Sequence, residues 1–302
     1  MGQDGVVRIV SLLPSATEIV CLLGLGDELV GVTHECDWPP QARKRRCVSY
    51  SNLPPDASPA EIDRLVGQAA SSDSPSQGLD RDALRELAPD LVLTQDLCAV
   101  CAVPAGHLRD ALDVLGVGAE VVSLDPSNLD DVLRDIVTVG RATGTEVRAG
   151  AVVDELRARL QRVREVVEGR GRPRTVALEW GDPPYNAGHW VPQMIEIAGG
   201  DALLAAAGVP STRIGWEEVG GAAADVVVFM PCGYDLEGAM AQVPALLERP
   251  ELDHVPAVFA AGANGYFSRP GPRLVDGVEA LAAALHGDCG IAAAPGTLAR
   301  VR

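Results

Sequence analysis

Short apolar runs rich in β-branched residues alternate along this chain with longer segments of helical periodicity. The runs that we predict to be strands are Val6–Val10, Leu29–Thr33, Leu91–Thr94, Glu120–Ser123, Thr175–Glu179, Asp225–Met230 and Ala257–Ala261. A strand that is apolar at nearly every position has to be buried on both faces, and helices are its usual cover. The alternation therefore predicts the α/β class, with parallel sheets covered by helices.

The first helix is predicted over Ala16–Leu23. Ser15 precedes it, and Glu18 follows three residues later, which is the spacing of a capping box. We therefore expect the side chain of Ser15 to cap this helix.

A second segment, residues 145–168, predicts an unusually long helix. It contains no proline and only one glycine, and its apolar residues recur at helical spacing while charged residues fill the other face. About 24 residues at 1.5 Å per residue give a helix of roughly 36 Å. We predict an N-terminal α/β lobe over residues 1–144, a linking helix over 145–169 and a C-terminal α/β lobe over 170–302.

The charge of the chain limits its partners. With 25 Lys and Arg against 42 Asp and Glu, the formal net charge is −17, which excludes nucleic acid and an anionic membrane surface as partners. The longest run without a charged residue, His254–Ser268, has 15 residues, whereas a membrane-spanning helix needs about 20. Met1–Gly5 has no basic residue, so no secretory signal is predicted. We expect a cytoplasmic monomer or dimer, periplasmic or membrane-anchored only if a leader was removed.

Aromatic residues are few and gather after the predicted strands. Of the 4 Trp, 4 Tyr and 3 Phe, those on such segments are Trp38, Trp180, Tyr185, Trp190, Tyr234, Tyr266 and Phe267. Ligands of parallel α/β sheets bind beyond the carboxyl ends of the strands, so these rings predict a stacking surface for a flat organic ligand. The alternative is that they pack loops against their own lobe. His189 and Arg269 are further candidates, the first as a neutral imidazole and the second for an anionic group of the ligand.

Histidine and cysteine follow two strands of the predicted N-terminal lobe. His34 and Cys36 follow one strand, and Cys98 and Cys101 follow another. These four side chains suit a metal site for zinc or iron, or a redox dithiol in which His34 lowers the pKa of a thiol. The remaining alternative is that the cysteines fill a core. We expect Cys98 and Cys101 to face a cleft between the lobes, with Cys36 as the nearest other thiol.

Three segments resemble a known family. Arg8–Glu18 (RIVSLLPSATE), Leu25–Thr33 (LGDELVGVT) and Ala88–Leu93 (APDLVL) resemble the cobalamin/iron-siderophore-type ABC transporter substrate-binding proteins, and within them the cobalamin-binding branch. The resemblance implies two Rossmann-like lobes with parallel sheets, joined by a single long helix, with a ligand cleft between the lobes. It also implies a corrinoid ligand and, if the protein is exported, an ABC permease as partner.

The same resemblance implies that Pro14, Ser15, Trp38 and Trp180 contact the ligand. His34, Cys36 and the Cys98/Cys101 pair depart from it, because a passive corrinoid binder does not need them. An alternative is therefore an enzyme on this fold, in which the cysteines and His34 form a metal or thiol centre and Glu179 acts with Cys98 and Cys101 in catalysis.

Overall fold

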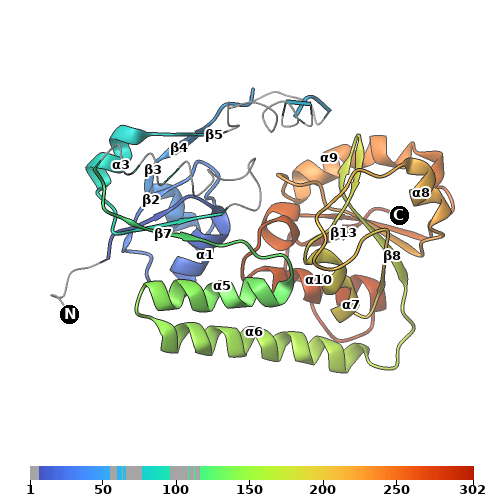
Figure 1. The fold of residues 1–302 in the computed structure, drawn as a ribbon. Helices are drawn as coiled ribbons and strands as arrows, with labels where there is room; N and C mark the ends of the chain where they lie inside the picture. Colours follow the sequence, from blue (N-terminus) through green and yellow to red (C-terminus); the bar gives the residue numbers. More distant parts are fainter. Residues whose placement is uncertain are drawn as a thin grey trace. The chain divides into compact units, whose positions relative to one another are not determined.

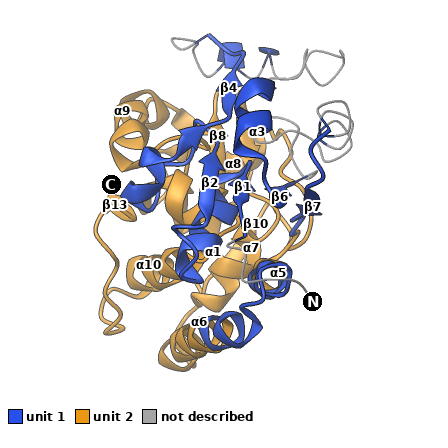
Figure 2. Ribbon diagram, turned by 90° about the vertical axis from the view of Figure 1, so that its left-hand side faces the viewer, with its two compact units in different colours: residues 1–126, 134–152 blue, residues 127–133, 153–302 orange. Residues whose placement is uncertain are grey.

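The chain forms two compact units in the computed structural model, which describes residues 7–54, 60–62, 64–65, 77–95, 108, 112 and 116–302. Unit 1 comprises Met1–Pro126 and Arg134–Val152, and unit 2 comprises Ser127–Leu133 and Val153–Arg302 (Figure 2). Each unit has its own sheet built around parallel strands, as the α/β prediction requires; the sheet of unit 2 also has two antiparallel strands. The predicted lobe boundaries stay a prediction.

Unit 1 is built on a parallel sheet with strand order β3-β2-β1-β6-β7. Its strands are β1 (Ile9–Ser11), β2 (Leu29–Val32), β3 (Arg46–Cys47), β6 (Leu91–Thr94) and β7 (Glu120–Ser123). A separate antiparallel pair is formed by β4 (Ser49–Ser51) and β5 (Gln77–Leu79). The other elements are α1 (Pro14–Leu22), the 3-10 helix η1 (Pro40–Lys44) and α3 (Arg81–Leu87).

The start of α1 differs from the prediction. Leu13, in extended conformation, is the N-cap, and no side chain caps the helix. Pro14 occupies the first turn, where its missing N–H costs no hydrogen bond. Ser15 therefore lies inside the helix, and its predicted capping role is wrong.

Unit 2 is built on a sheet with strand order β10-β8-β11-β12-β13. A sixth strand, β9, pairs with β8. Its parallel strands are β8 (Arg174–Gly181), β10 (Asp201–Leu203), β11 (Val226–Phe229) and β12 (Ala257–Ala261). Its antiparallel strands are β9 (Pro184–Asn186) and β13 (Leu298–Arg300). Its helices are α7 (Val191–Ile197), α8 (Trp216–Gly221), α9 (Leu236–Leu247), the 3-10 helix η2 (Pro250–Leu252), the single π-helical turn η3 (Asn264–Ser268) and α10 (Leu274–His286).

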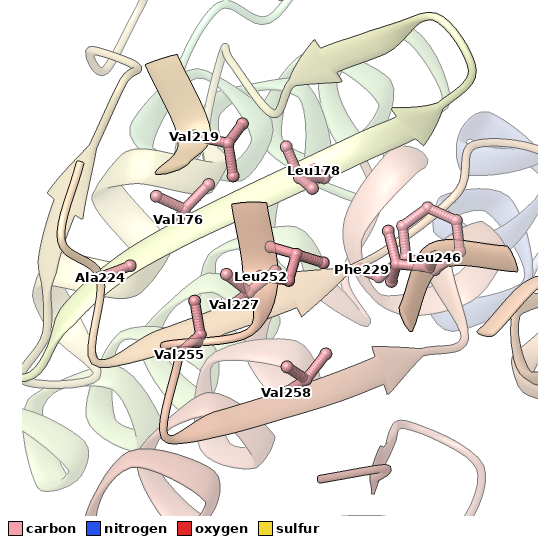
Figure 3. Packing of buried hydrophobic residues seen from close by; sticks show 10 residues of the cluster. All are labelled: Val176, Leu178, Val219, Ala224, Val227, Phe229, Leu246, Leu252, Val255 and Val258. Atoms are coloured by element: carbon pink, nitrogen blue, oxygen red, sulfur yellow. The ribbon is translucent and has the colours of Figure 1, made fainter. Parts of the chain in front are cut away.

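One core cluster of unit 2 packs on one face of this sheet, whose strand β11 is buried at every position. Figure 3 shows its strand residues converging with side chains from α8, α9 and η2; the cluster is Val176, Leu178, Val219, Ala224, Val227, Phe229, Leu246, Leu252, Val255 and Val258. Alternate residues of β8 and β11 contribute, because successive side chains of a strand point to opposite faces. This packing fixes the ends of β8 and β11, from which candidate ligand-binding residues extend.

Two helices belong partly to each unit. They are α5 (Leu129–Ala142) and α6 (Glu146–Val167), and they run side by side (Figure 1). Gly140 of α5 makes this approach possible, because a Cβ at that position would lie 2.4 Å from the Cβ of Ala149 on α6. The helix predicted over residues 145–168 is thus observed to within one residue at either end. No helix in the described ranges has the length and apolar character that crossing a bilayer requires.

Candidate functional site

Unit 2 gathers aromatic side chains at the carboxyl edge of its sheet. Because β8, β11 and β12 are parallel neighbours, the segments that follow them leave from one edge. Trp180 is the next-to-last residue of β8, and Tyr234 follows β11. Their ring centroids lie 6.2 Å apart, with a 46° angle between the ring planes. We call Trp180, Tyr185, Tyr234 and Tyr266 the aromatic edge of unit 2.

Main-chain hydrogen bonds hold this edge in place. The N–H of Cys232 donates to the carbonyl of Glu179 at 3.0 Å, which ties the segment after β11 to β8. The N–H of Asn264 donates to the carbonyl of Tyr234 at 3.1 Å, which ties it to the segment after β12. The Tyr234 ring is therefore carried by a segment that is fixed on both sides.

The strand pair β8–β9 places Tyr185 next to Trp180. The two residues are direct partners in the antiparallel register, and cross-strand partners of this kind have Cβ atoms about 4.5–5.5 Å apart. Both side chains are half-buried, as is Glu179. The Nε1–H group of Trp180 is buried without a hydrogen-bond acceptor in the described part of the chain. A buried donor of this kind has an unused capacity for a ligand acceptor.

Tyr266 lies in η3, directly after β12, and is half-buried. The guanidinium carbon of Arg273 lies 5.3 Å from the centre of its ring, a cation–π contact. Gly277 lets α10 come close, because a Cβ there would lie 2.2 Å from the carbonyl oxygen of Tyr266. Arg269 follows η3 in extended conformation and is half-buried. The edge thus combines aromatic rings with two cationic side chains.

Two predicted residues of unit 2 do not contribute to this surface. Phe267 is 1% exposed and Trp190 is 5% exposed. The Nε1–H of Trp190 donates to the carbonyl of Phe267 at 2.6 Å, so the two aromatic residues pack inside the unit. The expectation that they offer a stacking surface is therefore wrong.

His189 lies apart from Trp180 along the chain direction, because β9 runs antiparallel to β8. The N–H of Ala187 donates to the carbonyl of Ala177 at 3.0 Å, so His189 lies farther toward the start of β8. Ala177 itself precedes Trp180 by three residues, roughly 10 Å along a strand. Burial lowers the pKa of His189, which favours its neutral form. The main chain thus carries His189 away from Trp180, and a contact of its ring with the ligand stays a prediction.

The corresponding edge of unit 1 carries the segment after β2. His34 Nδ1 lies 2.8 Å from Ser49 Oγ, and the main-chain N–H of His34 donates to the same oxygen at 3.2 Å. Cys36 is buried, and its Sγ lies 3.0 Å from Thr17 Oγ1 on α1. His34 and Cys36 therefore turn to different partners. Within the described residues, no group of three or more His, Cys, Asp or Glu side chains could hold a metal ion.

The remaining predicted residues are distributed as follows. Cys98 and Cys101 lie outside the described residues, so the cysteine centre and its predicted cleft position stay predictions. Pro14 and Ser15 are buried in the first turn of α1, whereas Trp38 is 47% exposed. No sequence pattern identified Ser49 as the partner of His34. Arg273 was also missed, although its place directly before the last helix is a recognisable signal for anion binding.

Known proteins share sequence similarity with most of this chain. A sequence family described as periplasmic binding protein matches residues 9–260. The vitamin B12-binding protein of Yersinia pestis (strain Pestoides F) is 24% identical over 216 residues, which span 70% of this chain and 65% of that relative's length. The match confirms the family resemblance carried by the segments from Arg8 to Leu93.

Two solved structures share the fold. The periplasmic heme-binding protein RhuT from Roseiflexus sp. RS-1, in apo form, gives a TM-score of 0.70 at 24% identity over 94% of this chain and 100% of that chain. The periplasmic vitamin B12 binding protein BtuF of Vibrio cholerae gives 0.64 at 23% identity over 92% and 96%. These matches correct the predicted cytoplasmic location, which is wrong: the family and both structures are described as periplasmic.

Proposed function

We propose that this chain, which belongs to the periplasmic binding protein family, binds a flat, metal-bearing tetrapyrrole and passes it to an ABC permease. A corrinoid is our first candidate for the ligand. The observation that carries the proposal is the aromatic edge of unit 2, in which Trp180 and Tyr234 lie 6.2 Å apart between their ring centroids. The interlobe cleft that the resemblance implies stays a prediction.

The aromatic edge suits such a ligand for physical reasons. Large, nearly planar ligands bind by stacking and apolar contact, and aromatic rings supply both with little loss of conformational entropy. The Arg269 and Arg273 side chains complement this surface, because tetrapyrroles carry carboxylate, amide or phosphate substituents at their periphery. Orientation of the ligand would come from these groups and from the Trp180 indole N–H.

The choice between a corrinoid and a heme rests on the relatives. The curated relative from Yersinia pestis is a vitamin B12-binding protein, which favours a corrinoid. A heme is the second candidate, because the Roseiflexus structure with the same fold is a heme-binding protein. The alternative of an enzyme with a cysteine centre has no support among the described residues, since its Cys98/Cys101 pair lies outside them.

Equilibrium titration of the purified chain tests the proposal. Cyanocobalamin, aquocobinamide and hemin are added separately, and binding is followed by visible absorbance and by calorimetry. We expect a Kd in the micromolar range or below for at least one corrinoid, which corresponds to about −8 kcal/mol or better. Selective binding of hemin would establish the second candidate. The absence of heat and of a spectral change with all three ligands would refute the proposal.

A further inference from the structure

We propose that the imidazole of His34 binds the central metal of the tetrapyrrole through Nε2, held in position by Ser49. This inference rests on the proposed function and adds to it the kind of ligand: a tetrapyrrole whose metal has an open axial position. It also gives His34 a role apart from Cys36, Cys98 and Cys101, the other residues of the predicted metal site.

The first observation is the way in which Ser49 holds the ring. Ser49 Oγ lies 2.8 Å from Nδ1 of His34 and accepts the His34 main-chain N–H at 3.2 Å. One hydroxyl at the start of β4 thus engages both the side chain and the backbone of the residue that follows β2 by two positions. Histidines that ligate metals usually have their second ring nitrogen bound in this way, because the bond fixes the orientation of the ring.

The second observation is the state of the other ring nitrogen. The His34 side chain is 28% exposed, and its Nε2 lies 4.0 Å from the nearest Glu35 carboxylate oxygen, beyond hydrogen-bond distance. Within the described residues, Nδ1 thus engages Ser49, whereas Nε2 has only the longer contact of 4.0 Å with Glu35. Cys36 does not compete for the same metal, because its Sγ lies against Thr17 Oγ1 in the interior.

The third observation is the position in the fold. His34 follows β2 at the carboxyl edge of the unit 1 sheet, the edge where parallel α/β sheets bind ligands. Trp38, 47% exposed, lies on the same short segment. This segment of unit 1 can therefore supply both the imidazole of His34 for the metal and the indole of Trp38 for the tetrapyrrole ring.

The step is a ligand exchange at the metal. The Nε2 lone pair forms a coordinate bond to iron or cobalt, the water molecule at that axial position leaves, and the oxidation state of the metal does not change. Hemin and aquocobinamide have such an exchangeable position. Cyanocobalamin does not, because cyanide and its own nucleotide base occupy both axial positions. His34 should therefore matter for the first two ligands and not for the third.

The test compares four proteins: the wild-type chain, His34→Ala, Ser49→Ala and the control His254→Ala, which removes an exposed histidine. Each is titrated with hemin, aquocobinamide and cyanocobalamin, and folding is checked by thermal melting. We expect His34→Ala to lose the visible spectrum of the wild-type complex and to bind hemin or aquocobinamide at least about tenfold more weakly. Added imidazole should restore the spectrum, and cyanocobalamin binding should not change.

Ser49→Ala should weaken binding of the same ligands by about 10- to 100-fold, because the ring loses its orientation. His34→Gln, which retains a polar side chain, serves as a second variant if His34→Ala does not fold. The inference is overturned if His34→Ala or His34→Gln binds hemin and aquocobinamide with wild-type affinity and spectrum. If that occurs while Trp180→Ala still weakens binding, the proposed function stands without it. Binding of cyanocobalamin alone would likewise overturn it.

Discussion

The indole ring of Trp180 and the phenol ring of Tyr234 lie with their centroids 6.2 Å apart and their planes at 46°. Regular structure or main-chain hydrogen bonds hold the backbone at both residues. Trp180 is part of β8, and the backbone of Tyr234 is hydrogen-bonded to Pro231 and Asn264. A surface that is already ordered before binding loses little entropy when the ligand arrives. The pair is therefore suited to bind a ligand with little loss of conformational entropy.

Trp180→Phe separates stacking from hydrogen bonding at this edge. The variant keeps an aromatic face but removes the Nε1–H group, which is buried without an acceptor. If a ligand oxygen accepts this hydrogen bond, worth about 0.5–1.5 kcal/mol, affinity should fall about 2- to 13-fold. Calorimetric titration with the tetrapyrrole that binds best measures the effect. Unchanged affinity would mean that the indole N–H does not contact the ligand.

Arg159 joins α6 to α10 within unit 2. Its Nη2 lies 2.5 Å from Asp276 Oδ1 and 2.6 Å from Glu279 Oε2, and the bonds to Glu279 and Asp276 raise its pKa. Arg159→Met keeps the apolar stem but leaves both carboxylates without their partner. We expect the free energy of unfolding to fall by about 1.5–3 kcal/mol, as measured by urea denaturation.

The matched control for this variant is Arg162→Met, on the exposed face of the same helix. It should change the free energy of unfolding by less than about 0.5 kcal/mol. Equal effects of the two substitutions would show that the ion pairs of Arg159 add nothing beyond the helix itself.

Acid should destabilise the protein through two half-buried histidines. Burial lowers the pKa of His189 and of His286, which favours the neutral imidazole in the folded chain. Below about pH 6.5, the ordinary value, the unfolded chain binds protons that the folded chain excludes. The stability contributed by the neutral rings is therefore fully present above that pH and is lost as pH falls toward their folded-state pKa values.

His189→Asn tests this pH dependence, because asparagine tolerates the positive φ of 52° at this position. Melting temperatures at about pH 7.5 and about pH 5 should differ less in this variant than in the wild-type chain. His254→Asn, at an exposed position, should retain the wild-type difference. An unchanged difference in His189→Asn would assign the acid sensitivity to other groups.

The fold was predictable where short runs rich in β-branched residues lie between longer helical segments. β6, β7 and β12 match their predicted ranges, because such residues favour strands. β9, β10 and β13 were not predicted, since three residues are too few to show a period. Their pairing depends on β8 and β12, which contact them only in the folded chain.

The site was predictable only in part. The ends of β8 and β11 identified the edge that carries Trp180 and Tyr234, but the sequence does not show toward which side an aromatic residue turns. Phe267 turns inward because Gly277 lets α10 approach it: a Cβ on Gly277 would lie 3.2 Å from its ring. The contact of His34 with Ser49 was not predictable, because the two residues meet only when β4 packs beside the end of β2.

The most direct test of the account is the affinity of Trp180→Ala for the tetrapyrrole that the wild-type chain binds. Stacking on one aromatic side chain contributes about 1–3 kcal/mol, so affinity should fall about 5- to 150-fold. The control is Trp216→Phe. Trp216 begins α8, its ring lies against the guanidinium group of Arg249, and it is not part of the aromatic edge. We predict weaker binding by Trp180→Ala with a normal melting transition, and wild-type binding by Trp216→Phe. Wild-type affinity in a folded Trp180→Ala variant would contradict the assignment of the ligand to the aromatic edge of unit 2.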